Sequence, residues 1–209
     1  TLMRSSAASD VYKRQVFIDI GYFTAITMCY FLVEGFYYKP RVDYEVLETF
    51  HEGVIALSAC LAGEVQRYLG RGMYEEACRS ALHYETIFGK GNFFLELQDH
   101  GIPDQQLVNQ QLMKLSQETG IELVATNDVH YTYADDEKAH DILLCIQTGK
   151  KLSDENRMRY EGGQYYLKSE EEMQKVFPYA REAMDNTHKI AERCNVELSL
   201  IHISEPTRP

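Results

Sequence analysis

The stretch "NFFLELQDHGIPDQQLVNQQLMKLSQETGIELVATNDVHY" (92–131) decides the fold class of this chain. It predicts a strand at 92–97, then a helix that begins at Pro103 and stops at Gly120, then a second strand at 121–126. The helix carries apolar residues on one face: Leu107, Val108, Leu112 and Leu115. Strand, helix and strand in this order favour two parallel strands joined by a right-handed crossover.

The flanking sequence extends the same alternation. The run "GVIALSA" (53–59) is typical of a strand buried on both faces. Ser169 and Glu172 have the spacing of a capping box that opens a short helix. Further helices are expected at 61–69, 72–89, 135–147 (with Asp135 or Asp136 as the cap) and 181–198. We therefore predict an α/β domain with parallel strands, whose three units are too few to close a barrel but could form part of one.

Composition limits the function classes. The chain has 209 residues, is 44% hydrophobic and has a net charge of −11, which argues against a surface that binds nucleic acid through charge alone. Its five cysteines show no C-x-x-C spacing, so a reducing, cytoplasmic location is expected. The apolar stretch 16–35 contains Asp19 and is too short and impure for a membrane span, so no membrane partner is expected.

Polar residues gather where the predicted strands end. Parallel strands bring their carboxyl ends to one edge of a sheet, where the sites of such folds lie. The residues at these ends are Cys60 after the first strand, Glu96, Asp99 and His100 at the second, and Asp128 and His130 at the third. This edge is therefore the candidate site.

Asp128 and His130 are two positions apart in an extended segment, so their side chains point to the same side. A carboxylate oxygen and an imidazole nitrogen at one point suit a divalent metal such as zinc or manganese. Alternatively, Asp128 caps the next helix and His130 pairs with a carboxylate. Cys60 alone also fits a small buried apolar residue, and His100 also fits a residue that fixes the turn before Pro103.

Other polar residues have weaker patterns. Four other histidines are expected to be solvated or packed: His51, His83, His140 and His188. Four basic residues lie around an irregular segment that fits a solvated loop or a phosphate contact: Lys150, Lys151, Arg157 and Arg159. Lys39 and Arg41 in "YYKPR" are the better candidates for phosphate binding.

Several stretches together resemble one family, the alpha subunits of bacterial DNA polymerase III. The similarity follows the order of the family over roughly 34–198 and falls in the C-terminal half of its N-terminal polymerase and histidinol phosphatase (PHP) domain. The stretches are "EGFYYKPRVD" (34–43), "GVIALSACLAGEV" (53–65), "NFFLELQDHGIPDQ" (92–105), "VATNDVHY" (124–131), "AHDILLCIQTGK" (139–150) and "YYLKSEEEM" (165–173).

The resemblance implies a partial, distorted (β/α)7 barrel of the PHP type with a metal site at the strand ends. The family's ligands fall on Cys60, Asp128 and His130, which would bind zinc or manganese. In members with a complete site, this centre supports 3′→5′ exonuclease proofreading. The family's H-x-H motif, a later histidine and a glutamate should precede residue 34, and none is present. The chain alone is therefore expected to be inactive.

The resemblance also divides the chain. It implies a partial PHP domain at 34–180 and a connector toward the polymerase palm at 181–198, while 16–33 is doubtful. The ends, 1–15 and 199–209, read as non-native or disordered tails, and they resemble translated adapter sequence. The palm, with its magnesium and catalytic aspartates, is expected beyond residue 198, so no residue here is assigned to polymerisation.

Three functions stay open at this point. The first is a piece of a replicative polymerase with a proofreading PHP site; its parent would bind primer-template DNA, dNTPs, a sliding clamp, a clamp loader and a proofreading subunit. The second is a catalytically silent PHP scaffold that stabilises the polymerase or docks a separate exonuclease. The third is a stand-alone PHP phosphoesterase.

Overall fold

The computed structural model of this chain describes residues 42–194. Both predicted tails, the apolar stretch at 16–35, and the candidate phosphate-binding residues Lys39 and Arg41 lie outside the described residues. The expectations placed on them therefore stay predictions.

Three parallel strands form the centre of the fold. They are β1 (Ala56–Leu57), β2 (Phe93–Leu97) and β3 (Leu123–Ala125), arranged in the order β1-β2-β3. Leu57 pairs with Phe94, and Glu96 pairs with Val124. The prediction of an α/β domain with a parallel sheet is confirmed.

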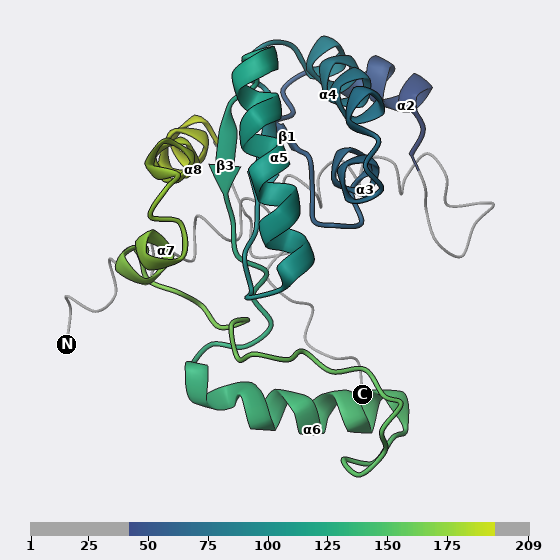
Figure 1. Ribbon diagram of the computed structural model, residues 1–209, viewed down its shortest axis with the longest axis vertical. Coiled ribbons are helices and arrows are strands. Elements are labelled where there is room, and N and C mark those ends of the chain that lie inside the picture. Colours follow the sequence, from purple (N-terminus) through teal and green to yellow (C-terminus); the bar gives the residue numbers. More distant parts are fainter. Residues whose placement is uncertain (1–41, 195–209) are drawn as a thin grey trace, which may run out of the picture.

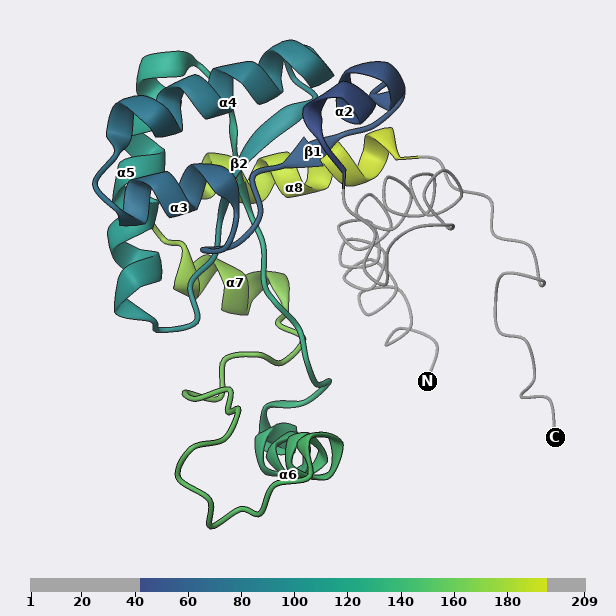
Figure 2. The same ribbon diagram turned by 90° about the vertical axis from the view of Figure 1, so that its right-hand side faces the viewer.

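Helices cover both faces of this sheet (Figures 1 and 2). On one face, α3 (Glu64–Gly70), α4 (Tyr74–Phe88) and α5 (Pro103–Thr119) form the larger apolar core with alternate residues of β2. The β2 members of that core are Phe93, Leu95 and Leu97. On the other face, Phe94 and Val124 pack with Ile190 of α8 (Arg181–Arg193). All five residues of β2 are buried, as a central strand requires.

The helix ends follow local sequence rules. Pro103 occupies the first turn of α5, and Gly120 ends the helix in the left-handed conformation with φ 78°. Ser169 and Glu172 form the predicted capping box of α7 (Glu170–Val176): the Glu172 amide donates to Ser169 Oγ at 3.3 Å, and the Ser169 amide donates to Glu172 Oε2 at 2.7 Å. These three predictions are confirmed.

Two elements differ from the expectation. Ala56 and Leu57 of β1 are only partly buried, so the prediction of a strand buried on both faces is wrong. The reason is that β1 is an edge strand among the described residues and pairs with β2 alone. Helix α2 (Tyr44–Phe50) was not predicted; it begins after Asp43, whose carboxylate accepts from the Val46 amide at 3.0 Å.

Helix α6 (Glu137–Thr148) lies apart from the sheet and its covering helices (Figures 1 and 2). It follows a short 3-10 turn, η1 (Ala134–Asp136), and ends at Gly149 in the left-handed conformation. Its apolar residues Leu143 and Ile146 are exposed. Within residues 42–194, no helix has the length and hydropathy needed to cross a membrane.

Helix α8 is fixed to the sheet by polar contacts. Asn186 Nδ2 donates to the Leu123 carbonyl at 2.8 Å, and Thr187 Oγ1 donates to the Ala125 carbonyl at 2.9 Å. The helix at 181–193 is therefore a layer of this domain. Its further role as a connector toward a polymerase palm stays a prediction.

Candidate metal centre

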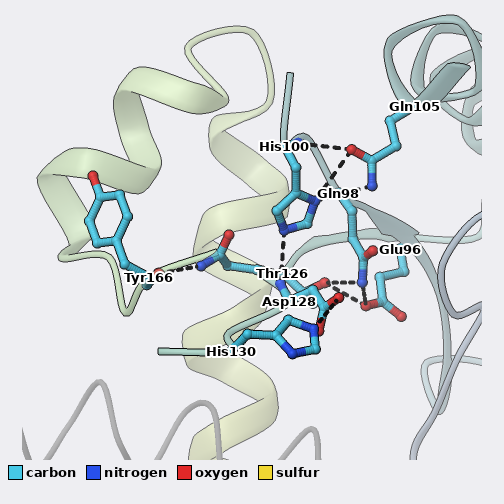
Figure 3. Close-up of polar contacts among 9 residues, drawn as sticks. Glu96, Gln98, His100, Gln105, Thr126, Asp128, His130 and Tyr166 are labelled. Atoms are coloured by element: carbon cyan, nitrogen blue, oxygen red, sulfur yellow. Dashed lines mark hydrogen bonds and ion pairs between the residues drawn. The ribbon is translucent and has the colours of Figure 1, made fainter. Parts of the chain in front are cut away.

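The segment after β3 brings the candidate residues to the carboxyl edge of the sheet (Figure 3). Thr126 and Asn127 are buried, and the chain then reaches the surface, where Asp128 and His130 are exposed and Val129 is partly buried. This alternation is what an extended segment predicts. The side chains of Asp128 and His130 therefore point away from the apolar core.

Asp128 and His130 contact one another. His130 Nε2 lies 3.1 Å from Asp128 Oδ2, and their side chains are 28% and 49% exposed, respectively. The alternative that His130 pairs with a carboxylate is confirmed, and that carboxylate is Asp128 itself. The alternative that Asp128 caps the next helix is wrong, because Asp136 accepts from the Tyr133 amide there.

Cys60 lies in the loop after β1 and is exposed. The interpretation of Cys60 as a small buried apolar residue is therefore wrong. Among residues 42–194, no three or more histidine, cysteine, aspartate or glutamate side chains lie close enough together to hold a metal ion. The structure brings Asp128 and His130 together and does not make Cys60 a third member, so the three-ligand assignment stays a prediction.

The His100 side chain is hydrogen-bonded to the backbone of Asp128. Its Nε2 accepts a hydrogen bond from the Asp128 amide at 3.2 Å, so this nitrogen carries no proton. Its Nδ1 faces Gln105, and its ring stacks on Tyr165 with centroids 4.4 Å apart. Burial lowers the pKa of His100, which fits the neutral ring that this contact requires.

The interpretation that His100 fixes the turn before Pro103 is also confirmed. Its backbone amide donates to Gln105 Oε1 at 2.8 Å, which links the end of β2 to the first turn of α5. The second contact, to Asp128, was not predictable from the sequence, because residues 28 positions apart meet only through the parallel pairing of β2 and β3.

Aromatic rings surround His130. Tyr160 lies 4.1 Å and His140 lies 5.5 Å from the His130 ring, measured between centroids. His140 is therefore packed, which is one of the two environments expected for it. Burial is the main cause that lowers the pKa of His140, and the electrostatic effect of His130 lowers it further. The His130 amide donates to the Tyr165 carbonyl at 2.8 Å, which holds the returning chain beside the site.

Arg157 differs from the expectation of a solvated loop residue, and Lys168 was not among the residues that the sequence indicated. Arg157 forms a bidentate ion pair with Asp141, with Nη2 2.7 Å from Oδ2, and its side chain is buried. The interpretation as part of a solvated loop is therefore wrong for this residue. Lys168 is buried, lies over the Tyr166 ring at 4.2 Å and contacts Asn127 Oδ1 at 3.4 Å. No sequence pattern marked Lys168, because its burial depends on the return of the chain to β3.

Stability should depend on the charge of Lys168. Burial lowers its pKa from 10.5 to about 8, so between these values the folded chain has lost a proton that the unfolded chain keeps. The unfolded state binds more protons there, and the stability contributed by this group rises with pH. The stability of the unaltered chain relative to Lys168→Met should increase by about 2 kcal/mol from pH 8 to pH 10 in urea titrations. The exposed control Lys175→Met should give no such slope; a flat difference for Lys168→Met would contradict the lowered pKa of the buried Lys168 amine.

The donor set partly fits a divalent metal. Asp128 offers a hard oxygen, His130 offers a nitrogen, and both face solvent, while two side chains leave most coordination positions to other groups. Cys60 offers a thiol after β1, which is separated from β3 by β2. The described residues therefore supply part of a site.

Comparisons with known proteins define the class first. Residues 20–100 match the family described as "PHP domain", so the chain contains part of a PHP domain, and its parallel sheet with flanking helices is a part of that fold. The match begins inside the segment 16–33 that the sequence left doubtful.

The relatives then give the family. The chain is 47% identical over 78% of its length to a protein of Borreliella burgdorferi, 48% identical over 79% to one of Deinococcus radiodurans, and 48% identical over 79% to one of Treponema pallidum. Each is named DNA polymerase III subunit alpha. The chain belongs to the family of bacterial DNA polymerase III alpha subunits. The matched segment spans only 14%, 12% and 14% of these relatives.

Proposed function

We propose that this chain is a piece of the alpha subunit of a replicative DNA polymerase, which extends primer-template DNA with dNTPs. The names of the relatives support this, and their much greater length leaves room for a palm with bound magnesium outside this chain. A sliding clamp, a clamp loader and a proofreading subunit are the proposed partners of the parent. None of residues 42–194 is assigned to nucleotide addition.

We propose further that Asp128 and His130, with Cys60, contribute to a PHP metal site for 3′→5′ exonuclease proofreading. The observation that carries this proposal is the exposed Asp128–His130 pair at the carboxyl edge of a parallel sheet. A bound zinc or manganese would supply positive charge to the phosphodiester that is cut. The Asp128 carboxylate, the His130 imidazole and the Cys60 thiolate would hold it.

The chain's own residues prepare this pair. His100 fixes the backbone of Asp128, and the Tyr165 carbonyl fixes the backbone of His130. Tyr160 restricts the His130 ring from one side. Two side chains held in this way need less ordering when a metal binds, which favours binding.

A silent PHP scaffold is the second candidate. It is favoured by the lack of any group of three ligands within the described part of the chain, residues 42–194. In that case the Asp128–His130 pair is only a polar contact of the surface, and the domain stabilises the polymerase or docks a separate exonuclease.

An exonuclease assay on the full-length subunit that contains this chain separates the two candidates. The double variant Asp128→Ala/His130→Ala should lower the release of 3′-terminal nucleotides from a labelled primer by at least about tenfold, because metal ligands are lost. Primer extension should change little, since polymerisation uses other residues. A parent subunit without exonuclease activity, or a variant that cuts as fast as the parent, contradicts the proofreading proposal and supports the scaffold.

A further inference from the structure

The segments that carry Cys60 and Asp128 are both tied to one buried carboxylate, that of Glu96. Glu96 is the fourth residue of β2 and is 5% exposed. Its Oε1 accepts from Thr126 Oγ1 at 2.5 Å and from Gln98 Nε2 at 3.0 Å (Figure 3). Because Thr126 lies two residues before Asp128, the first of these bonds fixes the strand end that leads to Asp128.

The second tie is to the turn before Cys60. The backbone amide of Ala59 lies beside the Glu96 carboxylate, where it is one of the groups that oppose the rise in the pKa of this acid. Ala59 has φ 67°, and no other residue except glycine has a positive φ in the described part of the chain. A left-handed conformation costs an alanine about 1–2 kcal/mol, so it persists only where neighbouring contacts hold it.

Neighbouring contacts hold this turn from two sides. Gln66 Nε2 donates to the Ala59 carbonyl at 2.8 Å and to Ser58 Oγ at 2.5 Å. Ser58 Oγ also accepts from the Glu96 amide at 2.8 Å. Cys60 and Glu96 line the same small cavity. The direction in which Cys60 leaves β1 is therefore set by Glu96 and Gln66 together.

The burial of the Glu96 carboxyl group requires an explanation, because the surrounding residues that the structure describes do not neutralise it. Among residues 42–194, no lysine, arginine or histidine forms an ion pair with it. Burial raises its pKa, its hydrogen-bond donors oppose this, and the nearby carboxylate of Asp128 raises it further. A buried acid without a cation costs stability, and an apolar side chain would avoid that cost. Thr126 Oγ1 after β3 and Gln98 Nε2 after β2 donate to it instead, and the Ala59 amide after β1 lies beside it.

We propose that Glu96 is a positioning residue that holds the Cys60 turn and the Asp128 strand end in a fixed relation to one another. Its role toward a metal rests on the function proposed above, whereas its role toward the two segments does not. Residues that position metal ligands without binding the metal change its affinity by about 10–100-fold when they are altered. Glu96 therefore couples the strand ends of β1, β2 and β3 into one site.

The test is Glu96→Gln in the 209-residue chain, observed by NMR. An amide has one acceptor oxygen and no charge, so it cannot accept from Thr126 and Gln98 and also attract the Ala59 amide. Exchange of the Ala59 amide with solvent should accelerate by about tenfold or more, while the amides of α5 keep their protection. Added Mn²⁺ should broaden the Asp128 and His130 amides with about tenfold weaker apparent affinity than in the unaltered chain.

The controls separate positioning from general stability. Glu122→Gln, at the opposite end of β3 and exposed, should change neither readout. Thr126→Val should weaken Mn²⁺ binding at Asp128 while leaving Ala59 protected, and Thr126→Ser should restore it; this pair decides the matter if Glu96→Gln unfolds.

Failure of the positioning role and failure of the proposed metal site give different results. Unchanged exchange of the Ala59 amide in Glu96→Gln, or unchanged Mn²⁺ binding in Thr126→Val, overturns the positioning role. If Mn²⁺ broadens neither Asp128 nor His130 in the unaltered chain, the proposed metal site fails. In that case the exchange rate of the Ala59 amide still decides the role of Glu96.

Discussion

Replacing Leu95 with alanine should lower the free energy of unfolding by about 2–5 kcal/mol, measured by urea denaturation. Leu95 is the middle residue of β2, is 0% exposed and lies in the core shared by α3, α4 and α5. Removing its side chain loses the transfer energy of the buried carbons and leaves a cavity. Helices on one face and a paired strand on each side of β2 limit how far this site can collapse.

The matched control is Leu107→Ala. Leu107 is a leucine of α5 with 55% of its surface exposed, so the same truncation should change stability by no more than about 0.5 kcal/mol. Equal effects of the two substitutions would contradict the placement of Leu95 at the centre of the core.

Replacing Gly63 with alanine should destabilise the chain by about 1–3 kcal/mol, because a new methyl group meets backbone atoms that cannot rotate away. A Cβ at this position would lie 2.2 Å from the Ser58 carbonyl oxygen and 3.0 Å from that of Cys60. The Ser58 amide is itself bonded to the Phe94 carbonyl at 2.9 Å, so a shift of Ser58 disturbs the pairing of β1 with β2. Thermal and urea unfolding measure the loss.

Gly70→Ala is the control with the opposite sign. Gly70 is the last residue of α3, and the nearest atom to an added Cβ is Val108 Cγ2 at 4.0 Å. Alanine restricts the unfolded chain more than glycine does, so stability should rise by about 0.5–1 kcal/mol. A gain of stability at Gly63 would contradict the close approach of the Cys60 turn to α3, and a loss at Gly70 would contradict the open space around that residue.

The β2–α5–β3 unit was predictable from local sequence. Pro103 and Gly120 mark the ends of α5, and the apolar runs on either side are long enough to indicate strands. The prediction for β1 was weaker because only Ala56 and Leu57 pair, which leaves burial to be decided by neighbours that a periodicity does not reveal. Helix α2 has seven residues and none is fully buried; Leu47 alone packs against the larger core, so the apolar pattern is too short to detect.

The Asp128–His130 pair was predictable because its geometry follows from two-residue spacing in an extended segment. Its supports were not. His100, Tyr160 and Glu96 reach the site from other elements, and their roles depend on the register of the sheet and on the return of the chain after α6. The exposure of Cys60 likewise follows from the left-handed turn at Ala59. This turn was not predictable, because alanine does not favour a positive φ.

The metal content of the full-length subunit that contains this chain tests the account most directly. Mass spectrometry of the purified subunit should find bound zinc or manganese, and Asp128→Ala/His130→Ala should lose at least part of it while Glu122→Gln keeps all of it. Equal metal content in the double variant and the unaltered subunit, or a subunit that binds neither metal, would contradict the assignment of Asp128 and His130 as ligands.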